Sequence, residues 1–180
     1  FDDVMNEQRK IIYKQRMEII NDFEIDNLIF DMRDSYIDDF IDENLGDIAE
    51  LDEKKKSLIK NKLKSDLNID LSFSSIKKIE NIQIDDIKSE IKKLSSTNIN
   101  LKKTKYSEEI FSFAEKSLLL QVLDKSWKEH LLSLDHLRQG ISLRAYGQKD
   151  PLNEYKQEAF LMLEEMMRQI RFNVSKIISF

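Results

Sequence analysis

Helix-breaking residues are almost absent from this sequence, and their scarcity constrains the fold more than any other feature. The 180 residues include three glycines and one proline. Folds rich in β-strands use these residues at most of their turns, so this chain has little means of turning between many short strands. Apolar residues make up 41% of the chain, which is enough to bury a core. We therefore predict an all-α protein.

The clearest helical pattern lies between residues 116 and 174, in two amphipathic arms joined by a short charged turn. Apolar residues recur in each arm at intervals of three and four, which places them on one face of a helix. They are Leu120, Leu123, Trp127, Leu131, Leu134, Leu137 and Ile141 in the first arm, and Tyr155, Ala159, Leu163, Met166, Ile170, Val174 and Ile177 in the second. Two such arms predict an antiparallel helical hairpin.

The turn of this hairpin is the strongest candidate for a contact site. Tyr146 lies between basic and amide side chains, those of Arg144, Gln148 and Lys149. Two interpretations of the tyrosine stay open from the residues alone. In the first, the ring packs back against the two arms of the hairpin. In the second, the ring is exposed and binds a polypeptide chain without sequence preference, since an aromatic ring offers contact area at a low entropy cost.

The ends of this turn also carry specific signals. Gly147 allows a backbone conformation that other residues resist. Asp150 is placed to cap the second arm, and Pro151 stands at the first helical position, where its missing amide hydrogen costs nothing. We therefore predict a sharply built turn.

The rest of the chain is predicted to form shorter helices around loops. We predict helices over residues 1–22 and about 24–44, a stop at Gly46, a third helix from Asp47 or Asp52, extended loop over 67–73, short helices from Ser75 and from Asp85, a connector over 95–104, and the start of the hairpin near Ser107. This gives three parts, residues 1–22, 23–104 and 105–180. The first helix is expected to pack along the hairpin.

Side chains that carry out chemistry are scarce, and we predict neither catalytic nor metal-binding residues. Of the two histidines, His130 is expected at the edge of the core, bonded to a neighbour, and His136 at the surface. There is no cysteine, phosphate loop or zinc motif. The net charge of −5 argues against non-specific nucleic-acid binding.

The sequence contains neither a continuous apolar run long enough for a membrane span nor a signal peptide at its start. Its first residues already belong to a helical pattern. We therefore expect the chain to be a piece of a larger protein.

Two stretches resemble the SecA family of bacterial preprotein translocase motors. The resemblance is carried by LQVLDKSWKEHLLSLDHLRQGISLRAYGQKDPLNEYKQEAF, which is similar to the C-terminal part of the family, and by FDDVMNEQRKIIYKQR, which is similar to the end of its long scaffold helix. Between residues 23 and 104 the amino-acid sequence is less similar to the family, but the length and position of this segment fit the family's wing domain.

This resemblance implies a role for each part. Residues 1–22 and 105–180 would be the helical scaffold domain, with the hairpin as its two-helix finger, and 23–104 the helical wing domain. The finger tip would lie near the mouth of the SecYEG channel and contact unfolded preprotein, with Tyr146 at the position of the main contact tyrosine. The finger would also restrain the ATPase until preprotein engages.

The resemblance also implies partners and a location. The scaffold would pack along the protein's own motor and preprotein-crosslinking domains, and these motor domains would bind ATP and magnesium. The Walker motifs of the motor and the family's cysteine-rich zinc tail are absent from this sequence, so we expect neither a cofactor nor enzyme activity in this piece. The whole protein would be cytoplasmic, attached peripherally to the inner membrane.

Rival interpretations are a free-standing helical adaptor, which binds partners through exposed apolar faces, and an independent enzyme, which rests only on scattered carboxylates and two unmatched histidines. Apolar flanks without their partner domains often pair with a second copy, so a homodimer is also an expectation.

Overall fold

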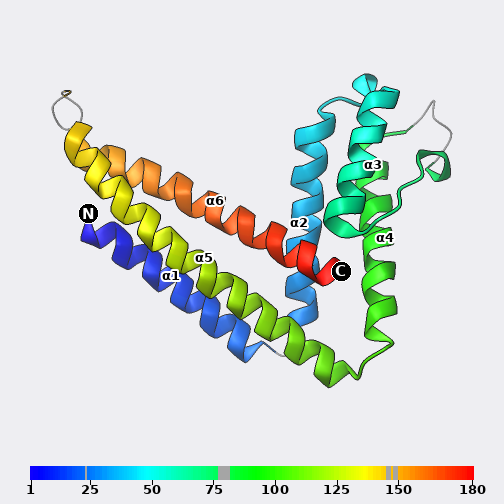
Figure 1. The fold of residues 1–180 in the computed structure, drawn as a ribbon, viewed down its shortest axis with the longest axis horizontal. Coiled ribbons are helices and arrows are strands. Elements are labelled where there is room, and N and C mark those ends of the chain that lie inside the picture. Colours follow the sequence, from blue (N-terminus) through cyan, green and yellow to red (C-terminus); the bar gives the residue numbers. More distant parts are fainter. Residues whose placement is uncertain (23, 77–81, 145–146, 148–149) are drawn as a thin grey trace. The chain divides into compact units, whose positions relative to one another are not determined.

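A computed structural model of the chain describes residues 1–22, 24–76, 82–144, 147 and 150–180, apart from the side chain at position 48. All regular structure in these residues is helical, which confirms the predicted all-α fold (Figure 1). The elements are α1 (Asp2–Asn21), α2 (Ile25–Leu45), η1 (Ile48–Glu50), α3 (Glu53–Leu67), η2 (Phe73–Ser75), α4 (Ile84–Lys103), α5 (Glu108–Arg144) and α6 (Pro151–Ser179), where η marks a short 3-10 helix.

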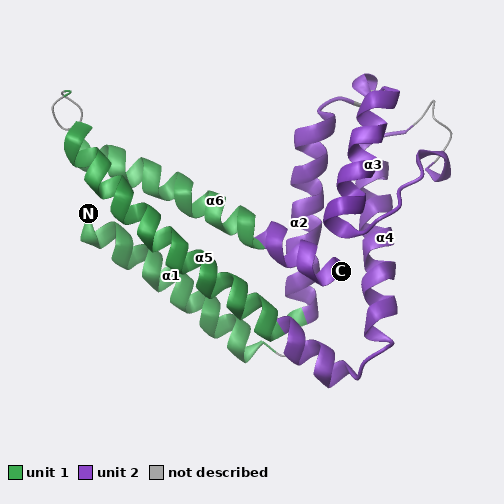
Figure 2. Ribbon diagram, in the orientation of Figure 1, with its two compact units in different colours: residues 1–25, 116–170 green, residues 26–115, 171–180 purple. Residues whose placement is uncertain are grey.

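The helices form two compact units, coloured separately in Figure 2. Unit 1 comprises residues 1–25 and 116–170, and unit 2 comprises residues 26–115 and 171–180. Both α5 and α6 contribute residues to each unit.

Unit 1 is a packing of α1 against the two arms of the hairpin. Salt bridges join Asp2 to Arg138 at 3.4 Å and Arg16 to Asp124 at 3.0 Å, so α1 runs antiparallel to α5. The core between the arms contains Leu134 and Ile141 from α5 and Tyr155 and Ala159 from α6. These contacts confirm the hairpin and the packing of the first helix along it.

Unit 2 has its own core, formed by α2, α3, α4 and the segment between α3 and α4. Its buried residues are Ile37, Phe40, Ile41, Leu45, Ile59, Leu63, Leu67, Ile69, Leu71, Phe73, Ile76, Ile82, Ile87 and Ile91. Three ion pairs align α2 with α4 in antiparallel register: Asp26 with Lys103 at 2.6 Å, Asp38 with Lys92 at 2.7 Å and Asp42 with Lys88 at 2.7 Å. Part of the acidic run on α2 therefore faces lysines of α4.

Most predicted helix ends match local capping geometry. Gly46 follows α2 with a φ of +65°, a value that glycine adopts at little cost. Asp52 caps α3 by accepting a hydrogen bond of 2.7 Å from the Lys55 amide. Of the two starts predicted for this helix, Asp52 is therefore the one observed. Ser107 accepts a hydrogen bond of 3.3 Å from the Ile110 amide at the start of α5.

The connector predicted over residues 95–104 is wrong, because α4 continues to Lys103. Its buried residues Ile87, Ile91, Ser95 and Ile99 follow one another every four residues. This face packs inside unit 2, and tertiary packing overrides the low helix propensity of the Ser-Ser-Thr-Asn stretch. The start was also misplaced: α4 begins at Ile84, and the Asp86 carboxylate accepts a hydrogen bond from the Gln83 amide at 3.1 Å.

The helix predicted from Ser75 also differs, since Ser75 ends the 3-10 helix η2. Residues 77–81 of that predicted helix lie outside the described residues.

The predicted faces of the hairpin arms are correct in part. Leu119 and His130 are buried where Leu120 and Leu131 were predicted, and Ile178 is buried where Ile177 was predicted. Leu123, Leu134 and Ile141 of α5 are buried as predicted. The misses are therefore single neighbouring positions in a stripe that is otherwise correct.

Candidate functional site

The hairpin tip is the contact site that the sequence predicts. Tyr146, Gln148 and Lys149 lie outside the described residues. Arg144, the last residue of α5, pairs through its guanidinium with the Glu158 carboxylate of α6. This half-exposed pair ties the two arms together just before the turn.

The far side of the turn is fixed by the predicted cap. Asp150 accepts a hydrogen bond of 3.1 Å from the Leu152 amide through its side chain, and another of 3.1 Å from the Glu154 amide through its carbonyl. Helix α6 begins at Pro151 as predicted. The backbone freedom expected at Gly147 stays a prediction, because the neighbouring residues 146 and 148 lie outside the described residues.

A buried polar bridge joins the three helices that support the tip. Gln8 of α1 donates a hydrogen bond of 3.0 Å to the Ala159 carbonyl of α6. Its side-chain oxygen lies 2.7 Å from Nε2 of His130 on α5. Since the Gln8 amide nitrogen donates to Ala159, its oxygen accepts, and His130 therefore donates through Nε2–H.

His130 is held neutral by this environment. Burial lowers its pKa below the ordinary value of 6.5. The Trp127 ring lies 5.6 Å from the imidazole, between ring centroids. The prediction of a core histidine bonded to a neighbour is confirmed, and His136 is exposed as predicted.

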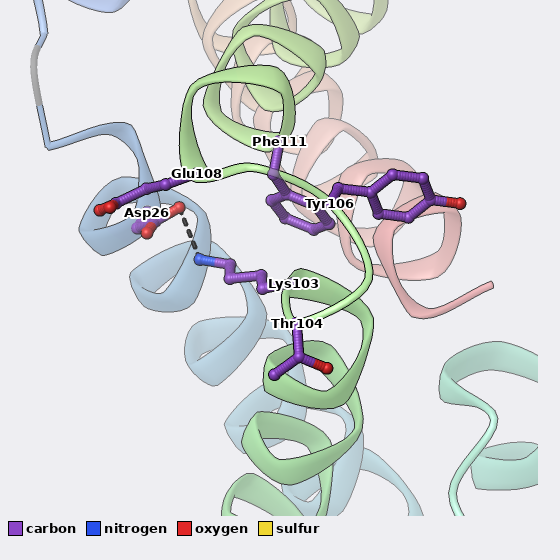
Figure 3. Close-up of a pocket in the computed structure, with 6 residues that line it drawn as sticks. All are labelled: Asp26, Lys103, Thr104, Tyr106, Glu108 and Phe111. Carbon is purple, nitrogen blue, oxygen red and sulfur yellow. Dashed lines mark ion pairs between the residues drawn. The ribbon is translucent and has the colours of Figure 1, made fainter.

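A second cluster of charged side chains lies within unit 2, beside a cavity of about 310 Å³. The cavity is lined by Asp26, Lys103, Thr104, Tyr106, Glu108 and Phe111 (Figure 3). Glu115 of α5 is 2% exposed, and its Oε1 lies 3.7 Å from Nζ of Lys103, one of the lining residues. Burial first, and then the neighbouring Asp26 carboxyl, raise the pKa of Glu115 to about 8.

Gln8 and Glu115 were missed by the sequence analysis, although the sequence contains a signal for each. Gln8 precedes the buried Ile12 by four residues, and Glu115 precedes the buried Leu119 by four. Both therefore lie on apolar helix faces, where a polar residue indicates a buried hydrogen-bonded group.

Neither a metal centre nor a membrane span is found in the part of the chain that the structure describes. In these residues no three His, Asp or Glu side chains gather closely enough to hold a metal ion. Within the same residues, each helix is too short or too polar to cross a bilayer.

Comparison with known proteins decides the family. The family model for the SecA wing and scaffold domain matches residues 1–179. The chain belongs to the SecA family. This confirms the resemblance seen in the sequence and associates the chain with protein transport.

Similar curated proteins are translocase subunits of much greater length. The protein translocase subunit SecA of Bradyrhizobium diazoefficiens is 37% identical over 171 residues, which cover 95% of this chain and 18% of the relative. SecA of Granulibacter bethesdensis is 37% identical over 179 residues, or 99% of this chain and 20% of the relative. The chain therefore spans about a fifth of the length of the curated relatives it matches.

Proposed function

We propose that this chain is the wing and scaffold part of a SecA-type translocase, which couples ATP-driven movements of a motor to the movement of preprotein through the SecYEG channel. The observation that carries this proposal is the family match over residues 1–179. Its relatives are named as protein translocase subunits.

Within this part, we assign residues 1–22 and 105–180 to the helical scaffold and residues 23–104 to the wing. The antiparallel packing of α1 along α5, with its salt bridges at both ends, supports a scaffold built from these two distant segments. The hairpin of α5 and α6 is the two-helix finger.

The finger tip is the proposed contact with unfolded preprotein and with the channel. Tyr146 supplies the main apolar contact, while Arg144, Gln148 and Lys149 add polar contacts. Two contacts fix the helix ends beside the tip: the Arg144–Glu158 pair joins the arms, and Asp150 caps the second arm. The finger also restrains the ATPase until preprotein is engaged.

Catalysis belongs to other parts of the protein. The sequence contains no phosphate loop, the element that would hold the phosphates of ATP in a motor domain. We assign ATP and magnesium to the motor domains of the full-length protein. The scaffold packs along those motor domains and the preprotein-crosslinking domain, and the protein acts in the cytoplasm at the inner membrane.

The proposal is tested by Tyr146→Ala in the full-length translocase. Loss of a central aromatic contact costs about 1.4 kcal/mol or more, so we expect preprotein transport to slow roughly tenfold while nucleotide binding stays normal. Tyr106→Ala, which truncates a tyrosine that is 60% exposed on unit 2, is the matched control and should leave transport unchanged. Site-specific crosslinking from position 146 to a preprotein stalled in the channel gives a direct readout. Normal transport without a crosslink would refute the contact.

A free-standing adaptor is the alternative function. Exposed apolar side chains on α1, such as Ile11, Tyr13 and Met17, suit a surface that binds a partner. The same side chains suit packing against further domains of a longer translocase. The greater length of the relatives favours the translocase.

A further inference from the structure

A charged cluster of unit 2, in which Glu115 is buried and Asp26 and Lys103 are partly exposed, lies where the chain passes into and out of that unit. By sequence, the chain enters unit 2 at Asp26 and first leaves it at Glu115. Lys103, at the end of α4, lies between these two side chains. Its Nζ is 2.6 Å from Oδ1 of Asp26, the ion pair drawn in Figure 3, and 3.7 Å from Oε1 of Glu115.

Aromatic rings hold the lysine in this position. Lys103 Nζ lies 5.0 Å from the ring centroid of Phe30 on α2 and 5.2 Å from that of Phe111 on α5. Contacts at these distances are favourable cation–π interactions. The ammonium group is therefore fixed between α2 and α5 by two carboxyls and two rings.

The cluster has one negative charge too many if both acids are ionised. Glu115 is 2% exposed, and the Lys103 ammonium beside it lies 3.7 Å from its Oε1, which is longer than a hydrogen bond. A buried carboxylate without donors is strongly disfavoured. A protonated Glu115 removes this penalty, because it leaves the Asp26–Lys103 ion pair neutral and can donate a hydrogen bond to Asp26.

The two acids are perturbed in opposite directions, as in other carboxyl pairs that hold one proton. Burial and then the hydrogen bond with Asp26 raise the pKa of Glu115, while the Lys103 charge opposes the rise. The hydrogen bond with Glu115, followed by the contacts with Lys103, lowers the pKa of Asp26 against the effect of its own burial. Asp26 from α2 and Lys103 from α4 are the charged groups that act on Glu115 within the described residues.

We propose that Asp26 and Glu115 share one proton and, with Lys103, form a proton-dependent latch that fastens the start of α2 and the start of α5 to the end of α4. The latch lies inside unit 2 and does not depend on the proposed contact at the finger tip.

The direction of its pH dependence follows from linkage. Folded Glu115 keeps its proton up to about pH 8, whereas the opened form loses it near 4.5. The contribution of Glu115 to the latch is therefore complete below pH 4.5 and weakens as the pH rises to about 8, by at most about tenfold in the opening equilibrium per pH unit. The contribution of Asp26, whose pKa is lowered, has the opposite sign and is lost only as the pH falls below the ordinary value of 3.8. Above that pH the dependence ends.

Hydrogen exchange in the full-length protein tests this proposal. After correction for intrinsic exchange rates, we expect amide protection in residues 26–34 and 100–116 to be at least about tenfold lower at pH 8 than at pH 6. Glu115→Gln keeps a donor for Asp26 but cannot titrate, so the ratio between the two pH values should approach one. Glu109→Gln, an exposed carboxyl on the same helix, is the matched control and should keep the wild-type ratio.

Infrared difference spectra provide a second readout that does not depend on how well Glu115→Gln folds. The wild-type protein should show a protonated carboxyl band at pH 6 that is lost by pH 9. In Asp26→Asn, Lys103 is released to pair with Glu115, and the band should be absent at pH 7. A protection ratio near one in the wild type, an unchanged ratio in Glu115→Gln, or no titrating carboxyl band would each overturn the latch.

Discussion

Gln8 and His130 illustrate how single polar residues fix the packing of unit 1. Three helices meet at a side chain that donates to one and accepts from another, with distances of 3.0 and 2.7 Å. Apolar contacts are not directional, so they leave helices able to slide or rotate against each other. A satisfied buried amide removes that freedom, because any shift would leave a polar group without its partner.

Replacement of His130 by Gln should remove part of the acid sensitivity of folding. The folded pKa of His130 is lowered by burial, so the unfolded chain takes up the proton first, near pH 6.5. Stability from neutral His130 is complete above pH 6.5 and is lost as the pH falls below it, by up to about 1.4 kcal/mol per pH unit. Urea denaturation at pH 7 and pH 5.5 should therefore show a smaller difference for His130→Gln than for the wild type.

His136→Gln is the control for this prediction, since His136 is an exposed residue of the same helix. Its stability should depend on pH as the wild type does. If the stability of His130→Gln and that of the wild type depend equally on pH, His130 does not take up a proton when the protein unfolds.

At the scale of elements, the sequence predicts helices well where apolar spacing and capping agree, and poorly where they conflict. Helix α3 has both an aspartate cap and a periodic apolar face, and its start was among those predicted. The end of α4 has polar, turn-like composition but a buried face that includes Ser95 and Ile99. Neither residue type nor local spacing reveals which partner covers that face, so the sequence alone could not extend the helix.

The same reasoning explains which parts of the candidate site were predictable. Asp150 and Pro151 act through local backbone geometry, which sequence spacing specifies. Gln8 and Glu115 act through helices distant in the sequence, and their partners follow only from the packing.

Substitution of Thr97 by proline tests whether residues 95–103 form the observed helix or the predicted connector. Thr97 is exposed within α4, and its hydroxyl donates to the Lys93 carbonyl at 3.0 Å. In a helix interior, proline removes a hydrogen bond and clashes with the preceding turn, so Thr97→Pro should cost about 3 kcal/mol or more. Thr97→Ala should be neutral or slightly stabilising. Denaturation followed by circular dichroism measures both, and full stability of Thr97→Pro would contradict a continuous helix.

At the scale of the whole molecule, the two units contain different apolar cores. The buried cluster that contains Leu63 in unit 2 shares no residue with the cluster that contains Leu134 in unit 1. Each unit therefore contains an apolar core of its own. In unit 2 that core consists mostly of isoleucine and leucine on α2, α3, α4 and the segment between α3 and α4, with ion pairs between α2 and α4 at its margin.

Truncation of Leu63 tests whether this core holds unit 2 together. Leu63 is 1% exposed on α3, and Leu58 of the same helix is 46% exposed. Leu63→Ala should destabilise unit 2 by about 2–5 kcal/mol, because it removes buried methyl groups and leaves a cavity. Leu58→Ala should change stability by about 0.5 kcal/mol or less.

Hydrogen exchange should locate the loss of protection caused by Leu63→Ala in residues 26–76 and 82–103. Residues 116–144, whose core lacks Leu63, provide the internal reference, and equal effects of the two variants would contradict the assignment of Leu63 to the core.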